Sequence, residues 1–88
     1  MMPFALRTSP HARKVLARLH SPIRERLDQA LALLEQKPRG RGCKPLEGAQ
    51  RPRWRRRVGA WRIVYLIHDA EGLVIVENVD RRDDVYRK

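Results

Sequence analysis

Apolar residues recur at helical spacing in the first part of the chain and predict two consecutive helices. Val15, Leu16 and Leu19 form an apolar stripe across residues 10–20. Ser9 followed by Pro10 is a typical start, with an N-cap residue before a proline in the first helical position. Ser21-Pro22 repeats this signal. The second apolar stripe then runs through Ile23, Leu27, Ala30, Leu31 and Leu34, and Lys37-Pro38 ends the second helix.

The remaining segments predict strands and turns. Residues 4–7 form a short candidate first strand. Residues 39–52 contain three glycines and two prolines, which predicts a loop. Two strands, at residues 53–58 and 61–68, flank a turn at residues 58–60. After a turn at residues 69–72, an apolar run over residues 73–79 predicts a strand inside a sheet, and residues 83–88 a short helical turn.

These elements follow one another in the order β-α-α-β-β-β, which predicts an α+β fold. We expect a small, antiparallel-rich sheet with the N-terminal helical hairpin packed on one face. Residues 1–88 are short enough for a single domain.

Positive charge is concentrated in one part of the chain. The formal net charge is +10, and residues 39–62 carry nine basic side chains opposed only by Glu47. A patch of this kind indicates a polyanionic partner: nucleic acid, an acidic protein or an anionic membrane surface. The basic residues are Arg39, Arg41, Lys44, Arg51, Arg53, Arg55, Arg56, Arg57 and Arg62.

Strand alternation separates these arginines by face. Arg53, Arg55 and Arg57 share one face of their strand, and Trp54, Arg56 and Val58 share the other. On the next strand Arg62 lies on the opposite face from Trp61, Ile63 and Tyr65. A row of guanidinium groups suits phosphate, because each can donate two hydrogen bonds at once. The alternative is a solvated sheet face, with Trp54 and Trp61 as packing residues.

Other features restrict the function classes. The single cysteine, Cys43, excludes an intrachain disulfide, and no cysteines and histidines stand at zinc-binding spacing. No apolar stretch approaches the roughly 20 residues of a membrane span. The first ten residues lack the apolar core of a signal peptide. We expect a cytoplasmic protein that has no structural zinc, no cofactor and no membrane partner.

The last residues add candidate chemistry. Arg81 or Arg82 can hold a phosphate. Tyr86 can act as an acid or base if positive charge lowers its pKa from about 10. A packing role is the alternative for Tyr86.

Three motifs together resemble the RelE/ParE superfamily of bacterial toxins, and RelE-type mRNA interferases most closely. They are Lys-Pro-Leu-Glu-Gly at residues 44–48, Trp-Arg-Arg-Arg-Val-Gly-Ala-Trp-Arg-Ile-Val-Tyr at residues 54–65, and Arg-Arg-Asp-Asp-Val-Tyr-Arg at residues 81–87. The resemblance covers nearly the whole chain and implies a RelE-like fold.

The resemblance also implies a metal-independent, ribosome-dependent endoribonuclease that cleaves mRNA through attack of the RNA's own 2′-hydroxyl and so inhibits translation. The implied partners are the ribosome, mRNA and a cognate antitoxin with an acidic segment. By position, the implied catalytic residues are Arg55, Arg57, Arg62, Arg81, Arg82 and Tyr86. We add Lys44, Arg51, Arg53 and Trp54 as RNA-binding residues.

The chain departs from the family pattern in ways that leave alternatives open. Some members carry lysines at the positions of Arg55 and Arg57, Arg81 replaces a common histidine, and Trp61 replaces a tyrosine. The lysine positions leave the identity of the general base open. Because arginine stays protonated, Tyr86, or the water and RNA groups around it, is the better candidate. A ParE-type inhibitor of DNA gyrase without nuclease activity and a non-catalytic nucleic-acid-binding module remain the alternative functions.

Overall fold

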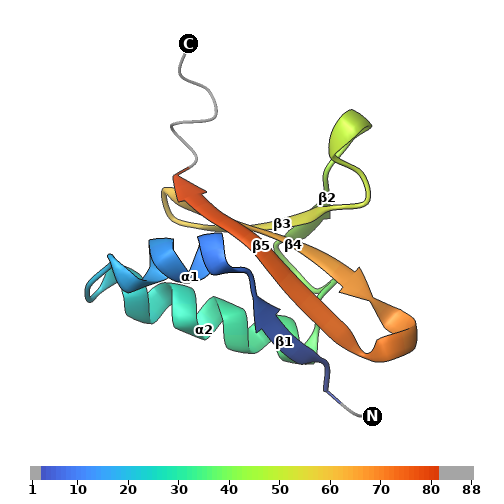
Figure 1. The fold of residues 1–88 in the computed structure, drawn as a ribbon, viewed down its shortest axis with the longest axis horizontal. Helices are drawn as coiled ribbons and strands as arrows, with labels where there is room; N and C mark the ends of the chain where they lie inside the picture. Colours follow the sequence, from blue (N-terminus) through green and yellow to red (C-terminus); the bar gives the residue numbers. More distant parts are fainter. Residues whose placement is uncertain (1–2, 82–88) are drawn as a thin grey trace.

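A five-stranded sheet carries two helices on one of its faces (Figure 1). The computed structural model describes residues 3–81. The sheet order is β1-β5-β4-β3-β2; β1 is parallel to β5, and the other neighbours are antiparallel. The elements are β1 (Ala5–Thr8), α1 (Pro10–Ala17), α2 (Ile23–Gln36), β2 (Cys43–Pro45), the 3₁₀ turn η1 (Gly48–Gln50), β3 (Trp54–Val58), β4 (Trp61–His68), the 3₁₀ turn η2 (Asp69–Glu71) and β5 (Leu73–Arg81).

The predicted α+β class and the helical hairpin on one face are confirmed. The predicted order lacked one strand, because residues 39–52 were expected to be a loop. Three of them form β2, which pairs with β3 and closes one edge of the sheet. Such a short edge strand, with a proline at its end, carries too little alternation to be predicted from the sequence. The predicted terminal turn over residues 83–88 lies outside the described residues.

The helix α1 begins as predicted. The hydroxyl oxygen of Ser9 accepts a 3.1 Å hydrogen bond from the amide of Ala12, which satisfies one of the free N–H groups of the first turn. The start of α2 differs from the prediction. Ser21 does not cap it: its hydroxyl donates to the carboxylate of Glu25, and Pro22 stands at the N-cap position. The helix α1 also ends at Ala17, before the predicted end at His20.

The core lies between the helices and the face of the sheet that they cover. Ile63 and Tyr65 of β4 are fully buried, as their alternation predicts, together with apolar residues of α1, α2 and β5. The hydroxyl of Tyr65 donates a 2.7 Å hydrogen bond to the carbonyl of Pro38, which follows α2. None of the helices in residues 3–81 combines the length and hydrophobicity that a membrane span requires.

A β-bulge in β5 changes which side chains face the helices. Val64 pairs with Asn78 while the next residue, Tyr65, pairs with Val76, so Glu77 is an extra residue in β5. Val76 and Val79 are consequently both buried in the core, although they are three residues apart. Ser9 holds the bulge, because its amide donates to Val76 and its hydroxyl donates to the carbonyl of Glu77, each at 2.8 Å.

Candidate functional site

The face of the sheet away from the helices carries the basic side chains that the sequence predicted to lie together. Trp54 and Val58 of β3 pack against the core, so the alternating residues Arg55 and Arg57 point away from the helices. We call the side of the sheet on which Arg55 and Arg57 lie, away from the helices, the open face. Arg56 lies on the helix side instead, where one of its amino groups donates to the carbonyl of Arg41 at 2.8 Å.

The strand register arranges the open face in two rows. In one row Arg57 stands opposite Arg62, and Arg62 stands opposite Asp80 of β5. In the other, Lys44 of β2 is opposite Arg55, followed by Val64 and Asn78. The structure therefore brings Lys44, Arg55, Arg57 and Arg62 together, as the sequence predicts.

Val64 is the buried member of the second row. It is 5% exposed, although it does not belong to the core cluster beneath the helices. The long side chains of the open face therefore cover apolar surface with their stems as well as carrying charge.

Arg62 forms a two-pronged ion pair with Asp80. Its Nε donates to Oδ1 and its Nη2 donates to Oδ2, both at 3.2 Å. The two side chains are only 16% and 26% exposed. The amide of Asn78 donates to Asp80 Oδ2 at 3.0 Å, so a second group of β5 fixes the carboxylate.

A second carboxylate of β5 engages another predicted binding residue. Arg53, just before β3, donates from its Nε to Glu77 Oε1. This ion pair spans the open face across β4, because β3 and β5 both lie beside β4. Arg53 thus belongs to the open face, as predicted.

The C-terminal candidates are not gathered with these residues in the part of the chain that the structure describes. Arg81 is the last residue of β5 and pairs with Trp61, which packs against the core, so its side chain leaves the strand on the helix side. Alternation along β5 therefore separates Arg81 from Arg62. Arg82 and Tyr86 lie outside the described residues.

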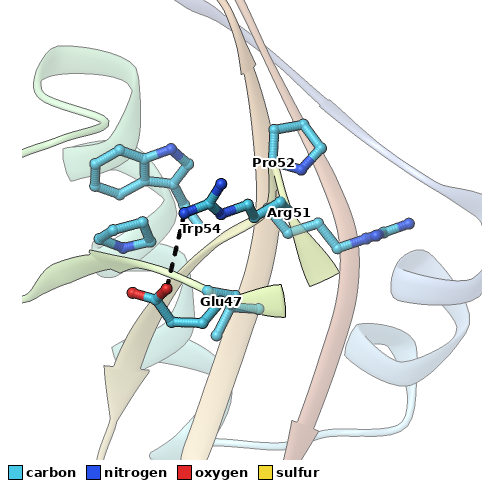
Figure 2. A pocket seen from close by; sticks show the side chains of 7 residues that line it. Glu47, Arg51, Pro52 and Trp54 are labelled. Carbon is cyan, nitrogen blue, oxygen red and sulfur yellow. Dashed lines mark ion pairs between the residues drawn. The ribbon is translucent and has the colours of Figure 1, made fainter. Parts of the chain in front are cut away.

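The predicted binding residues Arg51 and Trp54 line a small hollow beside η1 (Figure 2). It measures about 250 Å³ and has largely apolar walls that include Pro45, Leu46 and Pro52. A guanidinium nitrogen of Arg51 lies 4.0 Å from a carboxylate oxygen of Glu47 in an exposed ion pair. The hollow is therefore an apolar recess with a cation at its rim.

The indole of Trp54 is already in contact with a cation. The guanidinium of Arg39 lies 5.6 Å from the centre of the ring. Arg39 also donates two hydrogen bonds, of 2.7 and 2.9 Å, to Asp69. This hydrogen bonding lowers the pKa of Asp69 and raises that of Arg39. Trp54 thus packs between the core and Arg39, as well as lining the hollow.

A larger hollow of about 530 Å³ lies on the helix side, where the end of α2 meets the loop before β2. Leu33 lines it and is the large hydrophobic residue that stays most open to solvent, 52% exposed, among residues 3–81. Arg41 and Arg56 line the same hollow. This surface combines apolar area with positive charge.

Tyr65 is unsuited to proton transfer. Burial raises its pKa well above the ordinary value of a tyrosine, and its hydroxyl is bound to the carbonyl of Pro38. The chain has two tyrosines. The buried one is therefore a structural residue.

The sequence reasoning missed Glu77, Asn78 and Asp80. Residues 73–79 were interpreted as an apolar strand, and the acidic residues at its end received no role. The break in alternation at Glu77-Asn78 is the signal that could have indicated a bulge. In residues 3–81 no three His, Cys, Asp or Glu side chains cluster closely enough to hold a metal ion.

Residues 6–86 match the family described as ParE toxin of type II toxin–antitoxin system, parDE. The chain belongs to the RelE/ParE superfamily of type II toxins. This confirms the predicted resemblance and covers nearly the whole sequence. The comparison with curated proteins finds no match.

Solved toxin structures share the fold. The toxin is similar to a chain of the RelBE2 toxin–antitoxin complex from Mycobacterium tuberculosis, with 30% identity, a TM-score of 0.82, and coverage of 93% of this chain and 94% of that one. The isolated RelE toxin of E. coli gives 25% identity and a TM-score of 0.76 over 89% of this chain and 83% of that one. A chain of the archaeal RelE–RelB complex from Pyrococcus horikoshii shares the fold at 21% identity, with a TM-score of 0.79 over 92% of this chain and 97% of that one.

Proposed function

We propose that this toxin is an endoribonuclease that cleaves mRNA on the ribosome, in the cytoplasm, without a metal ion. The supporting observation is the convergence of Arg55, Arg57 and Arg62 on the open face, where they stand on adjacent strands. Two structures to which the toxin is similar, at 30% and 25% identity, are a RelBE complex and a RelE toxin. A surface of this composition suits an RNA backbone.

The proposed reaction needs charge stabilisation more than covalent chemistry. The 2′-hydroxyl of the RNA loses its proton and attacks the adjacent phosphorus. The bond from phosphorus to the 5′-oxygen breaks, the 5′-oxygen takes up a proton, and a 2′,3′-cyclic phosphate remains. Guanidinium groups stabilise the negative charge that develops on the phosphate oxygens in this step.

Proton transfer requires a different group, because arginine stays protonated in proteins. Tyr65 is unsuited, since its pKa is raised and its hydroxyl is engaged. Tyr86 is the remaining tyrosine of the sequence, and we assign it the acid–base role, alone or through water and RNA groups. Arg82 is proposed to hold the phosphate beside it. Arg81 is not assigned this role, because its side chain leaves β5 on the helix side.

The proposed protein partner is an antitoxin with an acidic segment. Chains of toxin–antitoxin complexes are among the structures that the toxin resembles. The net charge of +10 favours a partner of opposite charge, through faster association and through neutralisation of the basic surface.

The decisive experiment maps mRNA ends after the toxin is induced in bacteria. We expect new 5′ ends inside reading frames at a fixed codon phase, because cleavage takes place on translating ribosomes. A matched culture that expresses Arg62→Ala should lack them. Growth arrest without new 5′ ends would reject the ribonuclease.

Inhibition of DNA gyrase is the second candidate, and the match to the ParE toxin family favours it. It predicts growth arrest with intact mRNA and a loss of negative supercoiling by purified gyrase. A supercoiling assay with the purified toxin therefore separates the two functions. Binding to RNA with neither effect would indicate a non-catalytic module.

A further inference from the structure

The open face contains its own anions. Arg57 and Arg62 stand directly opposite each other on adjacent strands, and like charges in that arrangement repel. Asp80 continues the same row on the other side of Arg62. Its carboxylate offsets this repulsion by taking up Arg62.

The pairing is built into the fold rather than left to a flexible surface contact. Asp80 receives two hydrogen bonds from Arg62 and a third from Asn78. The bulge at Glu77 sets the register that places Asp80 opposite Arg62, and Ser9 holds the bulge through the Glu77 carbonyl. The Glu77 side chain binds Arg53 in turn.

We infer that Asp80 and Glu77 are internal counter-ions of the open face, and that a phosphodiester backbone binds there by displacing them from Arg62 and Arg53. A carboxylate and a phosphate present guanidinium with equivalent pairs of acceptor oxygens, so they compete for the same donors. The inference rests on the proposed function only for the identity of the polyanion as RNA.

Displacement of this kind discriminates against small anions. A tethered carboxylate acts at an effective concentration on the order of millimolar or higher. A single free phosphate must compete with this carboxylate for each arginine. An RNA strand presents several linked phosphates and can replace both carboxylates in one binding event. The counter-ions therefore favour a polymer over its monomers.

The test measures how tightly the full-length toxin binds a short single-stranded 2′-O-methyl RNA, which cannot supply the attacking hydroxyl. Asp80→Asn keeps the shape and an acceptor oxygen but removes the charge. We expect Asp80→Asn to bind this RNA about tenfold more tightly than Asp28→Asn does. In Asp80→Asn, Arg62 no longer has to release a carboxylate before it binds a phosphate, and one charge-assisted contact is of that order. Asp28→Asn is the matched control, because it changes the net charge equally on the distant helix α2, where Asp28 pairs with Arg24.

The dependence of RNA affinity on salt concentration is a second measurement, and it would not change if Asp80 had a purely structural role. In the wild-type toxin, the displaced Asp80 carboxylate takes up a cation from the solution. This uptake cancels one of the cations that the RNA releases on binding. The plot of log affinity against log salt should therefore be steeper for Asp80→Asn by roughly 0.7 to 1 than for wild type. If Asp80 only positioned Arg62, the substitution would weaken binding, which would overturn the inference.

A double-mutant cycle locates the effect. In an Arg62→Gln background, Asp80→Asn should no longer strengthen binding beyond the Asp28→Asn control. A gain that persists there would mean a general field effect and would overturn the inference. Glu77→Gln is the second variant, and its gain should vanish in an Arg53→Gln background.

Tripolyphosphate separates this inference from the proposed function. A stronger affinity of Asp80→Asn for tripolyphosphate, with no RNA cleavage by wild type, would retain the counter-ions and reject the ribonuclease. Equal affinities of Asp80→Asn and Asp28→Asn for both polyanions, or no binding by any variant, would reject the counter-ions. If Asp80→Asn bound an acidic peptide more tightly than Asp28→Asn did, but bound neither the RNA nor tripolyphosphate more tightly, the phosphodiester would be rejected as the ligand.

Discussion

The hydroxyl of Tyr65 in β4 donates a 2.7 Å hydrogen bond to the carbonyl of Pro38, which follows α2. This bond joins the central part of the sheet to the end of the helical hairpin, beneath the open face. Tyr65 is fully buried, so its hydroxyl needs a partner, and the carbonyl of Pro38 supplies one. The core thereby fixes the strand that also carries Arg62.

Tyr65→Phe should destabilise the toxin without removing its activity. It leaves the Pro38 carbonyl without its donor, a loss of about 1 to 3 kcal/mol in the free energy of unfolding. Urea denaturation of both proteins measures this difference, and RNA cleavage by the folded variant should match wild type. A variant of wild-type stability that had lost cleavage would contradict the structural role of Tyr65.

The raised pKa of Tyr65 also predicts loss of stability at alkaline pH. The unfolded tyrosine releases its proton near pH 10, while burial keeps the folded one protonated. Stability from this group is therefore complete below about pH 10 and falls as the pH rises toward the folded value. The pKa of Tyr65 also responds to the neighbouring side chains Cys43, Arg56 and Arg39. The control is Tyr65→Phe, which has no ionisable group at this position, so its unfolding free energy should change less between about pH 9 and 11.

Sequence reasoning succeeded where one local pattern determines the structure. Ser9-Pro10 fixes a helix start because the side chain, the cap and the first turn are neighbours in sequence. The same dipeptide at Ser21-Pro22 gave a wrong N-cap, since the Ser21 hydroxyl donates to the Glu25 carboxylate instead of accepting from the backbone. Alternation along β3 and β4 assigned Arg55, Arg57 and Arg62 to the open face.

The parts that could not be predicted depend on partners distant in sequence. A bulge shifts register by one residue, and only the pairing of β5 with β4 shows that Asp80 stands opposite Arg62. Before the shift is known, Glu77 and Asp80 have no assigned neighbours. The position of Arg81 follows from the same register, which is why it did not join the open face as expected.

Ser9→Ala should cost more stability than Ser21→Ala, because Ser9 is half-buried and forms two side-chain hydrogen bonds. Loss of an N-cap lowers stability by about 1 kcal/mol, and the hydrogen bond to the Glu77 carbonyl is lost as well. Ser21→Ala is the matched control, because Ser21 binds only an exposed carboxylate, and it should change stability by less than about 0.5 kcal/mol. Thermal or urea denaturation compares them, and equal losses would refute the double role of Ser9.

Arg62→Ala should reduce RNA cleavage far more than Arg13→Ala. Arg62 stands between Arg57 and Asp80 on the open face, whereas Arg13 is exposed on α1 and carries the same charge. Removing one charge-stabilising donor typically lowers the rate by about 10² to 10³-fold. Because the substitution removes the ion-pair partner of Asp80, the comparison uses protein shown to be folded by circular dichroism. Similar losses in both variants would indicate net charge as the cause.

Tyr86→Phe should abolish RNA cleavage while leaving affinity for RNA and thermal stability close to wild type. The substitution removes only the ionisable hydroxyl, and Tyr65 cannot replace it because it is buried and bound to Pro38. General acid–base catalysis contributes typically 10² to about 10⁴-fold, so single-turnover rates should fall within that range while the dissociation constant stays unchanged. Undiminished killing of bacteria by Tyr86→Phe would remove the tyrosine from the reaction and shift proton transfer to water and the groups of the RNA, with the arginines of the open face still carrying the charge stabilisation.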